Sequence, residues 1–435
     1  MASYVIEGSH PIAGRVQIPG SKNAVTKVLM ASLLSEEPSE IGNVPPIFEL
    51  DLTLDLLASL GARIERNTHR VRIQRGPDFH SRISKEQASH NRMAVLAVAP
   101  LLHAFGSVTL PKNLGGDRIG PRPVNFHLDA YRQLGASVEE TEENYLIRCE
   151  GLKGGEITLP YPSVSTTENV LLAASLAKGT TLIRGAAVEP EVLDLVLFLQ
   201  KMGAIIEHNT DRTYVVEGRE RLKGTRHFVL PDRITCASYA ALAIATGGRI
   251  EAAGARQEHM LAFLNTLRRM NAPFEVGDGI TFGNLDRPAL KPVSLETNVH
   301  PGFMTDWQPP TVILMTQASG SSVLHETVYE NRLEYTQTLA RMGGQIQLDT
   351  RCLGGSPCRF HYKDHLHSCV VRGPTLLKGT DVEVPDLRAG FSYVIAALCA
   401  RGRSRITHIE RIERGYGELH TTLAALGARI ERVED

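Results

Sequence analysis

The sequence predicts an α/β protein of two similar domains, built from six copies of one unit. Three observations lead to this prediction. The chain has 435 residues, more than a single hydrophobic core usually serves, so two or more domains are expected. A short motif recurs six times, and an apolar helix-like stretch precedes each copy. Three such units would fill a domain of ordinary size.

The recurring motif joins the end of a helix to a strand. A helix-like stretch ends in leucine or methionine, Gly-Ala or a near copy follows, and a strand-like tail comes next. The copies read SLGARIE, QLGASVE, KMGAIIE, RMNAPFE, RMGGQIQ and ALGARIE, with markers Leu60, Leu134, Met202, Met270, Met342 and Leu426. The markers recur roughly every 70 residues, and such self-similarity is typical of a repeated supersecondary unit.

A second helix-like stretch, rich in small and branched apolar residues, precedes each motif. The six stretches read NAVTKVLMASLLSEEPSEI, NRMAVLAVAPLLHAFGSVTL, ENVLLAASLAKGTTLI, ITCASYAALAIATGGRIE, PPTVILMTQASGSSVL and LRAGFSYVIAALCARGRSRI. In the first, Val25, Val28 and Leu29 follow helical spacing, and in four of the others a single glycine ends the helix. Because these helices are apolar nearly all round, we expect them in the core.

The domain boundary is expected near Leu230–Arg233, where the fourth apolar helix starts. We predict one domain of residues 20–230, which carries a loop with Asp117, and a second of residues 1–19 plus 231–435. No Pro/Ser-rich linker marks the join, which favours a compact pair with a cleft. Clefts between domains are where small-molecule sites usually lie.

Charge and targeting signals favour small-molecule partners. The 47 basic and 48 acidic residues nearly cancel, so no overall field attracts nucleic acid or an acidic membrane. The N-terminus MASYVIEGSHPIAG lacks the basic and apolar regions of a signal peptide, so we expect a cytoplasmic protein. Six cysteines in so long a chain do not resemble a secreted disulfide framework, and reduced thiols are expected.

Motifs along the whole chain carry a resemblance to a known family. They are PGSKNA from Pro19, GGDRIGPRP from Gly115, PSVSTTEN from Pro162, LPDR, HPGFMTDWQ, ENR, DLRAG and ERGY. With them the chain resembles the UDP-N-acetylglucosamine 1-carboxyvinyltransferases, a family of enolpyruvyl transferases. The resemblance implies a two-domain inside-out α/β barrel of six βαβαββ-type units. The sister family acting on shikimate 3-phosphate carries Ser and Arg after the loop lysine, whereas Lys22 precedes Asn23 and Ala24.

The resemblance also implies a reaction. The family transfers the enolpyruvyl group of phosphoenolpyruvate to the 3-hydroxyl of UDP-N-acetylglucosamine and releases phosphate, without a metal or cofactor, in the first committed step of peptidoglycan synthesis. Two alternatives stay open: the same chemistry on another nucleotide or nucleotide sugar, and a catalytically silent relative that binds UDP-sugars. Asn125, Tyr161 and Ser165 stand where familiar members carry Asp, Lys and Gly, which keeps the first alternative open.

Phosphoenolpyruvate carries a carboxylate and a phosphate, so its site needs several guanidinium forks. Lys22 stands between a Pro-Gly-Ser turn and a helix, where backbone N–H groups and an ammonium converge on one anion. By resemblance the phosphoenolpyruvate site comprises Lys22, Asn23, Arg122, Arg332, Arg388 and Arg414. The UDP-sugar site implied comprises Asn23, Arg92, Arg122, Pro123, Val124, Asn125, Phe126, Ser163, Val164, Ser165, Asp306 and Val328.

The catalytic residues implied by the resemblance are Asp117, Asp306, Lys22, Arg122 and Arg414. Asp306 would accept the proton of the sugar hydroxyl as its oxygen attacks C2 of the enolpyruvate. Asp117 stands where many members carry the cysteine that protonates C3. Burial would raise the pKa of Asp117, as this role requires, while the neighbouring Arg118 and Arg122 would lower it.

An insertion of residues 351–373 separates the fifth motif from DLRAG. It contains Cys352, Cys358, His361, His365, His367 and Cys369. Such residues can bind zinc, but no C-x2-C pair is present, and a plain hairpin with Gly-Gly-Ser-Pro as its turn is the favoured interpretation. We therefore predict no metal ligands, and metal binding by the insertion stays open as the less favoured alternative.

Overall fold

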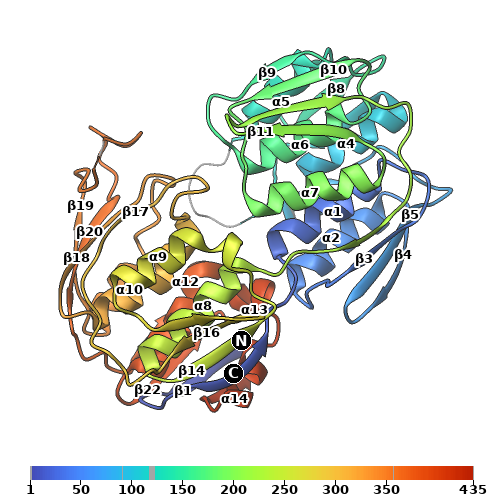
Figure 1. The fold of residues 1–435 in the computed structure, drawn as a ribbon. Coiled ribbons are helices and arrows are strands. Elements are labelled where there is room, and N and C mark those ends of the chain that lie inside the picture. The colour runs from blue at the N-terminus through green and yellow to red at the C-terminus, as the bar shows by residue number, and fades with distance from the viewer. Residues whose placement is uncertain (1, 91, 117–122, 356, 435) are drawn as a thin grey trace. The chain divides into compact units, whose positions relative to one another are not determined.

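The computed structural model describes residues 2–434 except 91, 117–122 and 356. The described residues form two compact units (Figure 1). The N unit comprises residues 20–116 and 123–230, and the C unit comprises residues 2–19 and 231–434. Each unit contains three sheets within the part of the chain that is described.

One βαβαββ unit repeats throughout the fold. In the third copy, β9 is parallel to β10, and β12 is antiparallel to both β10 and β11, which gives the order β11-β12-β10-β9. The other four-stranded sheets repeat this pattern. The sheet β6-β8-β7 has three strands, and an isolated parallel bridge between Arg82 and Thr109 stands in place of the fourth. The predicted α/β fold of six repeated units is confirmed.

The elements of the N unit follow this repeat in chain order. They are α1 (Lys22–Ser32), β3 (Ser39–Gly42), α2 (Phe48–Ser59), β4 (Ala62–Asn67), β5 (Arg70–Arg75), α3 (Lys85–His90), α4 (Ala94–Phe105), β6 (Ser107–Pro111), α5 (Asn125–Gln133), β7 (Ser137–Glu140), β8 (Asn144–Arg148), β9 (Glu156–Thr158), α6 (Val164–Ala174), β10 (Thr180–Arg184), α7 (Pro190–Lys201), β11 (Ile205–Asn209), β12 (Thr213–Glu217) and β13 (Arg226–Phe228).

The elements of the C unit come from both ends of the chain. They are β1 (Ala2–Glu7), β2 (Ala13–Gln17), α8 (Arg233–Thr246), β14 (Arg249–Ala253), η1 (Gln257–His259), α9 (Leu261–Arg269), β15 (Phe274–Val276), β16 (Ile280–Gly283), β17 (Ser294–Glu296), η2 (Thr305–Trp307), α10 (Gln308–Gln317), β18 (Gly320–His325), α11 (Thr336–Arg341), β19 (Gln345–Asp349), β20 (Ser368–Gly373), β21 (Asp381–Glu383), α12 (Leu387–Cys399), β22 (Arg403–Thr407), α13 (Glu410–Tyr416), α14 (Leu419–Ala425) and β23 (Arg429–Glu434).

Three strands complete sheets whose other members are distant in sequence. Strand β13 pairs in parallel with β3, and β2 pairs in parallel with β14. Strand β1 lies between β22 and β23, so the two chain ends lie side by side in the C unit (Figure 1). The chain therefore passes from the C unit to the N unit after β2 and returns after β13.

The six marker residues share one structural role. Each is largely buried and forms the C-cap of its helix. The next residue is left-handed in every copy, with φ of 89° at Gly61, for example, and 57° at Asn271. Glycine adopts this conformation without a Cβ clash, and asparagine tolerates it better than most residues, so RMNAPFE ends its helix like the glycine copies.

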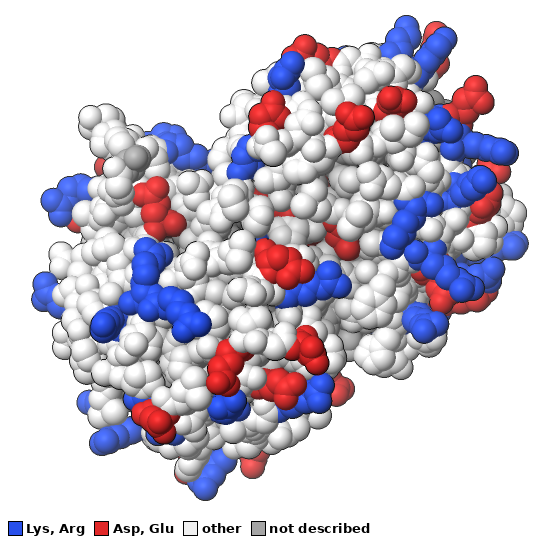
Figure 2. Space-filling view, in the orientation of Figure 1, with Lys and Arg blue, Asp and Glu red and all other residues white. Residues whose placement is uncertain are grey.

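The apolar helices lie in the core, as the sequence predicts. Helices α8, α10 and α12 pack against one another in the C unit, and α4 packs on α6 in the N unit. In α12 every residue from Leu387 to Leu398 is buried. None of the helices in the described residues is long and apolar enough to cross a membrane. Acidic and basic side chains are interspersed over the face shown in Figure 2.

Candidate active site

In the C unit, aspartates stand at the N-terminal ends of the three packed helices. The Asp232 carboxylate caps α8 by accepting from the N–H groups of Ile234 and Thr235, at 2.8 and 3.0 Å. The Asp386 carboxylate caps α12 and accepts from the N–H groups of Arg388 and Ala389. Asp306 lies in η2, directly before α10. Carboxylates at these ends are stabilised by the helix dipoles and by unpaired N–H groups.

Two buried arginines connect these helix ends. Arg332 donates from Nη2 to Asp306 Oδ1 at 2.9 Å and from Nη1 to Asp386 Oδ1 at 3.4 Å. Arg388 lies with Nε 3.8 Å from Asp306 Oδ2 and donates from Nη1 to the Tyr416 hydroxyl at 2.9 Å. The structure therefore brings together three of the predicted site residues: Asp306, Arg332 and Arg388.

Both guanidinium groups stay charged despite their burial. Burial lowers the pKa of Arg332, but the carboxylates of Asp386 and Asp306 more than offset it, so the pKa rises above its ordinary value. The pKa of Arg388 is likewise raised, since Tyr416 and Asp306 outweigh burial. Buried guanidinium forks of this kind bind carboxylate and phosphate oxygens in a bidentate manner.

The Glu326 carboxylate connects two side chains near Asp306 with the backbone at Val328. It is fully buried and accepts from Thr305 Oγ1 at 2.8 Å and from Gln308 Nε2 at 3.2 Å through one oxygen. Through the other oxygen it accepts from the Val328 N–H at 2.8 Å. Sequence reasoning missed Glu326, Asp386 and Tyr416, although the last two lie within the quoted motifs DLRAG and ERGY.

Arg414 lies on the short helix α13, which packs against α12 and also carries Tyr416. Arg388 donates to the hydroxyl of Tyr416 on this helix, so the half-buried Arg414 lies at the same end of the C unit as Arg388. Its predicted contact with substrate stays a prediction.

In the N unit, Lys22 is the first residue of α1, as the sequence predicts for a helix that begins after a Pro-Gly-Ser turn. Its Nζ lies 3.9 Å from the Glu49 carboxylate of α2. Asn23 follows in the first turn, and its carbonyl accepts from Lys27 Nζ at 2.6 Å. Arg92 lies in the turn before α4.

The starts of α5 and α6 are joined by hydrogen bonds through His127. Burial, with a smaller contribution from Arg92, lowers the pKa of His127 to about 3, so the imidazole is neutral. Its Nδ1 accepts from Asn169 Nδ2 at 3.0 Å, which leaves Nε2 to donate to Ser165 Oγ at 3.2 Å. The Tyr131 hydroxyl donates to Asn169 Oδ1 at 2.8 Å and completes the chain.

Most of the N-unit residues that are predicted to bind the UDP-sugar lie at the helix ends joined by these contacts. Val124, Asn125 and Phe126 stand at the start of α5, and Ser163, Val164 and Ser165 stand at the start of α6. Ser163 caps α6, with its hydroxyl accepting from the Thr166 N–H. Pro123 and Asn125 are exposed and Phe126 is half-buried, so this end of the unit presents side chains to solvent.

Asp117, Arg118 and Arg122 lie outside the described residues, and their predicted roles stay predictions. The cleft predicted between the two domains also stays a prediction.

The favoured interpretation of the insertion as a plain hairpin is wrong in part. Strands β19 and β20 do pair antiparallel, but β19 ends at Asp349 and β20 begins at Ser368. The described residues between them form no helix or strand. Cys369 lies in the core within β20, opposite Leu324.

Comparisons with known proteins identify the family of the chain. The family described as EPSP synthase (3-phosphoshikimate 1-carboxyvinyltransferase) matches residues 6–423. The chain is 44% identical to the UDP-N-acetylglucosamine 1-carboxyvinyltransferase of Protochlamydia amoebophila, over 99% of this chain and 94% of that protein. It is 42% identical to the protein of the same name from Chlamydia trachomatis serovar D, over 99% and 98% of the two chains.

Solved structures share the fold. The enolpyruvyl transferase NikO from Streptomyces tendae superposes with a TM-score of 0.86 at 22% identity, over 99% of each chain. EPSP synthase from Acinetobacter baumannii superposes with a TM-score of 0.75 at 17% identity, over the full length of both chains.

Proposed function

The chain belongs to the UDP-N-acetylglucosamine 1-carboxyvinyltransferase family of enolpyruvyl transferases, and on this premise we propose that it transfers the enolpyruvyl group of phosphoenolpyruvate to the 3-hydroxyl of UDP-N-acetylglucosamine. Phosphate is the second product, and the reaction is the first committed step of peptidoglycan synthesis. The observation that carries the proposal is the buried network of Arg332, Arg388 and Asp306 at the helix ends of the C unit.

This network suits a small donor with two anionic groups. Arg332 and Arg388 supply two permanently charged forks, and Arg414 lies on the neighbouring helix α13. The family resemblance adds Lys22 and Arg122 to the residues proposed to bind phosphoenolpyruvate. The Ser21 hydroxyl is buried beside Lys22 without a hydrogen-bond partner among the described residues, as expected for a group that meets a ligand.

The reaction is proposed to run by addition and then elimination. Asp306 accepts the proton of the 3-hydroxyl as its oxygen bonds to C2, and Asp117 delivers a proton to C3. The bond from C2 to the phosphate oxygen then breaks, C3 loses a proton, and the enol ether and phosphate leave. Arg332 holds the Asp306 carboxylate in place throughout, since it donates to Oδ1.

The UDP-sugar is proposed to bind the helix ends of the N unit. Helices α5 and α6 present N–H groups together with the hydroxyls of Ser163 and Ser165. Backbone amides and hydroxyls at helix N-termini suit diphosphate oxygens and the polar edge of a pyrimidine. Both substrates are water-soluble anions, and a cytoplasmic location is part of the proposal.

One assay tests the activity. Phosphate release is measured after phosphoenolpyruvate is mixed with UDP-N-acetylglucosamine and, separately, with other nucleotides and nucleotide sugars. Release with the first acceptor supports the proposal. Release only with another acceptor supports the alternative suggested by Asn125, Tyr161 and Ser165, and no release with any acceptor leaves a silent UDP-sugar binder.

The role of Asp117 has a separate test. The epoxide antibiotic fosfomycin alkylates the cysteine that many family members carry at this position. A carboxylate is a poorer nucleophile than a thiolate, so fosfomycin should leave the enzyme active. Asp117→Asn should abolish turnover and leave UDP-sugar affinity nearly unchanged. Rapid covalent inactivation at Asp117, or an active Asn variant, would contradict the role.

A further inference from the structure

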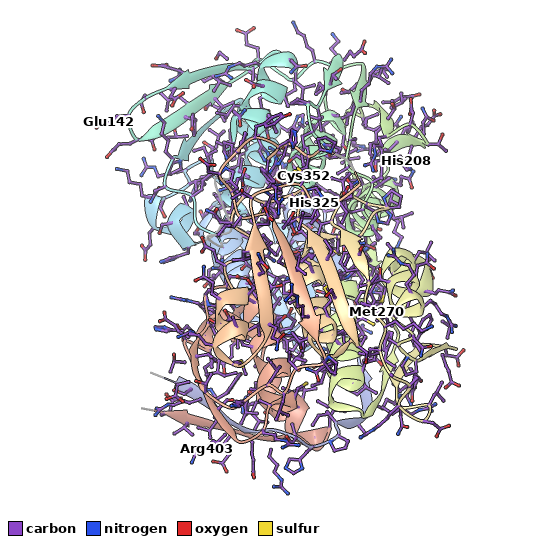
Figure 3. All side chains as sticks on the ribbon, turned by 90° about the vertical axis from the view of Figure 1, so that its left-hand side faces the viewer. Glu142, His208, Met270, His325, Cys352 and Arg403 are labelled. Carbon is purple, nitrogen blue, oxygen red and sulfur yellow. The ribbon has the colours of Figure 1, made fainter. Side chains whose placement is uncertain are left out.

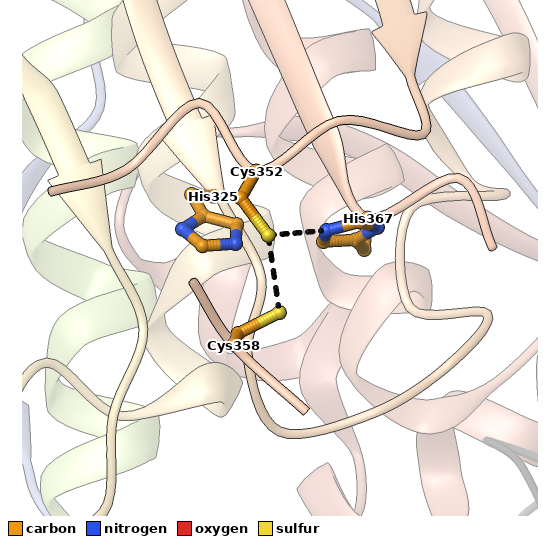
Figure 4. A group of neighbouring side chains, drawn as sticks. All are labelled: His325, Cys352, Cys358 and His367. Carbon is orange, nitrogen blue, oxygen red and sulfur yellow. Dashed lines mark hydrogen bonds between the residues drawn. The ribbon is translucent and has the colours of Figure 1, made fainter. Parts of the chain in front are cut away.

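Four metal-ligating side chains meet at one end of the sheet β17-β18-β20-β19. His325 ends β18, Cys352 and Cys358 lie in the insertion after β19, and His367 directly precedes β20. Figure 3 places His325 and Cys352 together at this end of the strands. The ligand atoms of the four residues all lie within 4.8 Å of one another and face a common centre (Figure 4).

Two of the separations match the edges of a zinc tetrahedron. With Zn–S of about 2.3 Å and Zn–N of about 2.05 Å, a tetrahedron separates two sulfurs by about 3.8 Å and a sulfur from a nitrogen by about 3.5 Å. The Sγ atoms of Cys352 and Cys358 are 3.7 Å apart, and Cys352 Sγ lies 3.4 Å from His367 Nε2. A disulfide would bring the sulfurs to about 2.05 Å, and both thiols are free.

His325 has the surroundings of a metal ligand. The residue is fully buried, and its Nε2 has no hydrogen-bond partner within the described chain. Its Nδ1 lies 3.0 Å from Glu296 Oε2, so the carboxylate accepts the Nδ1 proton and leaves a lone pair on Nε2. A buried imidazole nitrogen without a partner is costly, and a metal ion would satisfy it.

The other ligands are oriented in a similar way. His367 donates from Nδ1 to the His365 carbonyl at 2.8 Å, which leaves Nε2 with a lone pair toward Cys352. Cys358 Sγ accepts from the Phe360 N–H at 3.3 Å. A carboxylate or carbonyl behind each ligating histidine is typical of zinc sites, where it fixes the tautomer and the ring orientation.

We propose that His325, Cys352, Cys358 and His367 bind one structural zinc ion. Two thiolates and two imidazoles in a tetrahedron favour zinc over magnesium or calcium, which prefer oxygen ligands. Because all four positions are filled by protein atoms, the ion has no open position for a substrate. The two thiols release their protons on binding. The prediction from sequence considered only the residues of the insertion. His325 lies outside the insertion, at the end of β18, and supplies the fourth ligand.

The ion would hold the insertion against the strand that leads into the candidate active site. Arg359, one residue after Cys358, donates from Nη2 to the Val328 carbonyl and lies 3.5 Å from the Glu330 carboxylate. His325 directly precedes Glu326, which fixes Thr305 and Val328. Zinc therefore stabilises a loop whose described residues form no helix or strand, and this role is independent of the proposed activity.

Metal content is the first test. The full-length chain, purified without a histidine tag from zinc-supplemented cells, should hold about one zinc per chain. Cys352→Ser and His325→Gln should lose most of it, whereas Cys149→Ser, in the N unit, should retain it. Wild-type protein with little zinc and no uptake from added zinc would overturn the proposal, as would a Cys352–Cys358 disulfide in the protein as isolated.

Cobalt substitution tests the ligand set. Cobalt(II) bound by two thiolates should show a thiolate-to-metal charge-transfer band that the Cys352→Ser/Cys358→Ser double variant lacks. His361→Ala should keep the band, although His361 Nδ1 lies 3.5 Å from Cys352 Sγ. Loss of the band in His361→Ala alone, or its survival in the double variant, would contradict the four ligands named.

A pair of glycine variants avoids removing any ligand. A Cβ on Gly354 would lie 1.9 Å from Glu296 Oε2 and 2.1 Å from His325 Nδ1, whereas a Cβ on Gly355 would meet nothing within 4 Å. Gly354→Ala should therefore weaken zinc affinity about 10-fold or more, measured by competition with a chromophoric chelator, because the support behind His325 shifts. Gly355→Ala should match the wild type. Equal affinities in the two variants would overturn the proposal.

Discussion

The two units begin their buried helices with different chemistry. In the C unit, the carboxylates of Asp232 and Asp386 cap α8 and α12, and Asp306 precedes α10. In the N unit, Ser21 and Ser163 hold the N-cap positions of α1 and α6. The same repeat thus places negative side chains at one set of helix ends and neutral hydroxyls at the other.

This difference teaches how one fold makes two kinds of anion site. Carboxylates in the C unit recruit buried arginines, so Arg332 and Arg388 are positioned before any substrate arrives. Helices with serine at the N-cap position in the N unit keep their positive dipole ends for a ligand, with Lys22 at the start of α1. The first arrangement suits a small donor with two charges, and the second suits a larger phosphorylated acceptor.

The largest expected effect comes from Asp306→Asn. Asparagine keeps the size of the side chain and can still accept from Arg332, but it cannot take the proton of the sugar hydroxyl. We expect kcat to fall about 10²- to 10⁴-fold with little change in thermal stability. Steady-state kinetics with both substrates measure this. Asp129→Asn, which removes the exposed ion pair with Arg132, is the control and should leave kcat unchanged.

Arg332→Met tests whether the C unit depends on its paired charges. The variant leaves Asp306 and Asp386 without their shared guanidinium, so the free energy of unfolding should fall by about 3 kcal/mol. Arg132→Met, which breaks an exposed pair, should cost less than about 1 kcal/mol in the same urea titration.

Arg332→Lys separates folding from binding at the same position. Lysine keeps the charge but not the fork, so kcat/KM for phosphoenolpyruvate should fall about 10²-fold in a protein that still folds. A folded lysine variant with wild-type kcat/KM would show that Arg332 serves the fold alone.

Ser163→Asp makes the N unit resemble the C unit at one helix end. Aspartate caps helices about as well as serine, so stability should be preserved while its charge repels a diphosphate. We expect KM for the UDP-sugar to rise about 10-fold, on the order of 1.4 kcal/mol, and KM for phosphoenolpyruvate to stay the same. Ser163→Asn is the matched neutral control. Equal KM values in the two variants would place the diphosphate elsewhere.

The repeat could be predicted from the sequence because its signal is local. A buried marker followed by a left-handed residue recurs in every copy, including the one that uses Asn271. The completion of sheets by β2 and β13 could not be predicted, since parallel pairing between distant segments leaves no periodic pattern near either strand.

The candidate site was predictable to a similar extent. Motifs identified Asp306, Arg332 and Arg388, which the structure joins directly. The carboxylate of Asp386, which pairs with Arg332, was missed. A helix cap such as Asp386 becomes a partner of Arg332 only when separate repeats pack together. His325 was missed for the same reason: strand pairing of β18 with β20, rather than spacing along the chain, brings it near His367.

The last expected effect concerns a buried carboxylate that has no hydrogen bond among the described residues of the N unit. Glu168 on α6 is fully buried, neither oxygen has a hydrogen-bond donor among the described residues, and Lys27 Nζ lies 3.9 Å away. Burial raises the pKa of Glu168 from 4.5 to about 8, since Lys27 offsets it only in part and Glu191 adds repulsion.

Between these two pH values the folded chain holds a proton that the unfolded chain has released, so this group makes stability fall as the pH rises from about 4.5 to about 8. Glu168→Gln removes that dependence. The difference in unfolding free energy, variant minus wild type, should therefore increase by more than about 1 kcal/mol between pH 5 and pH 8 in urea titrations. Glu150→Gln, at an exposed position, should show no such trend. A flat difference for Glu168→Gln would mean that Lys27 fully compensates the buried charge.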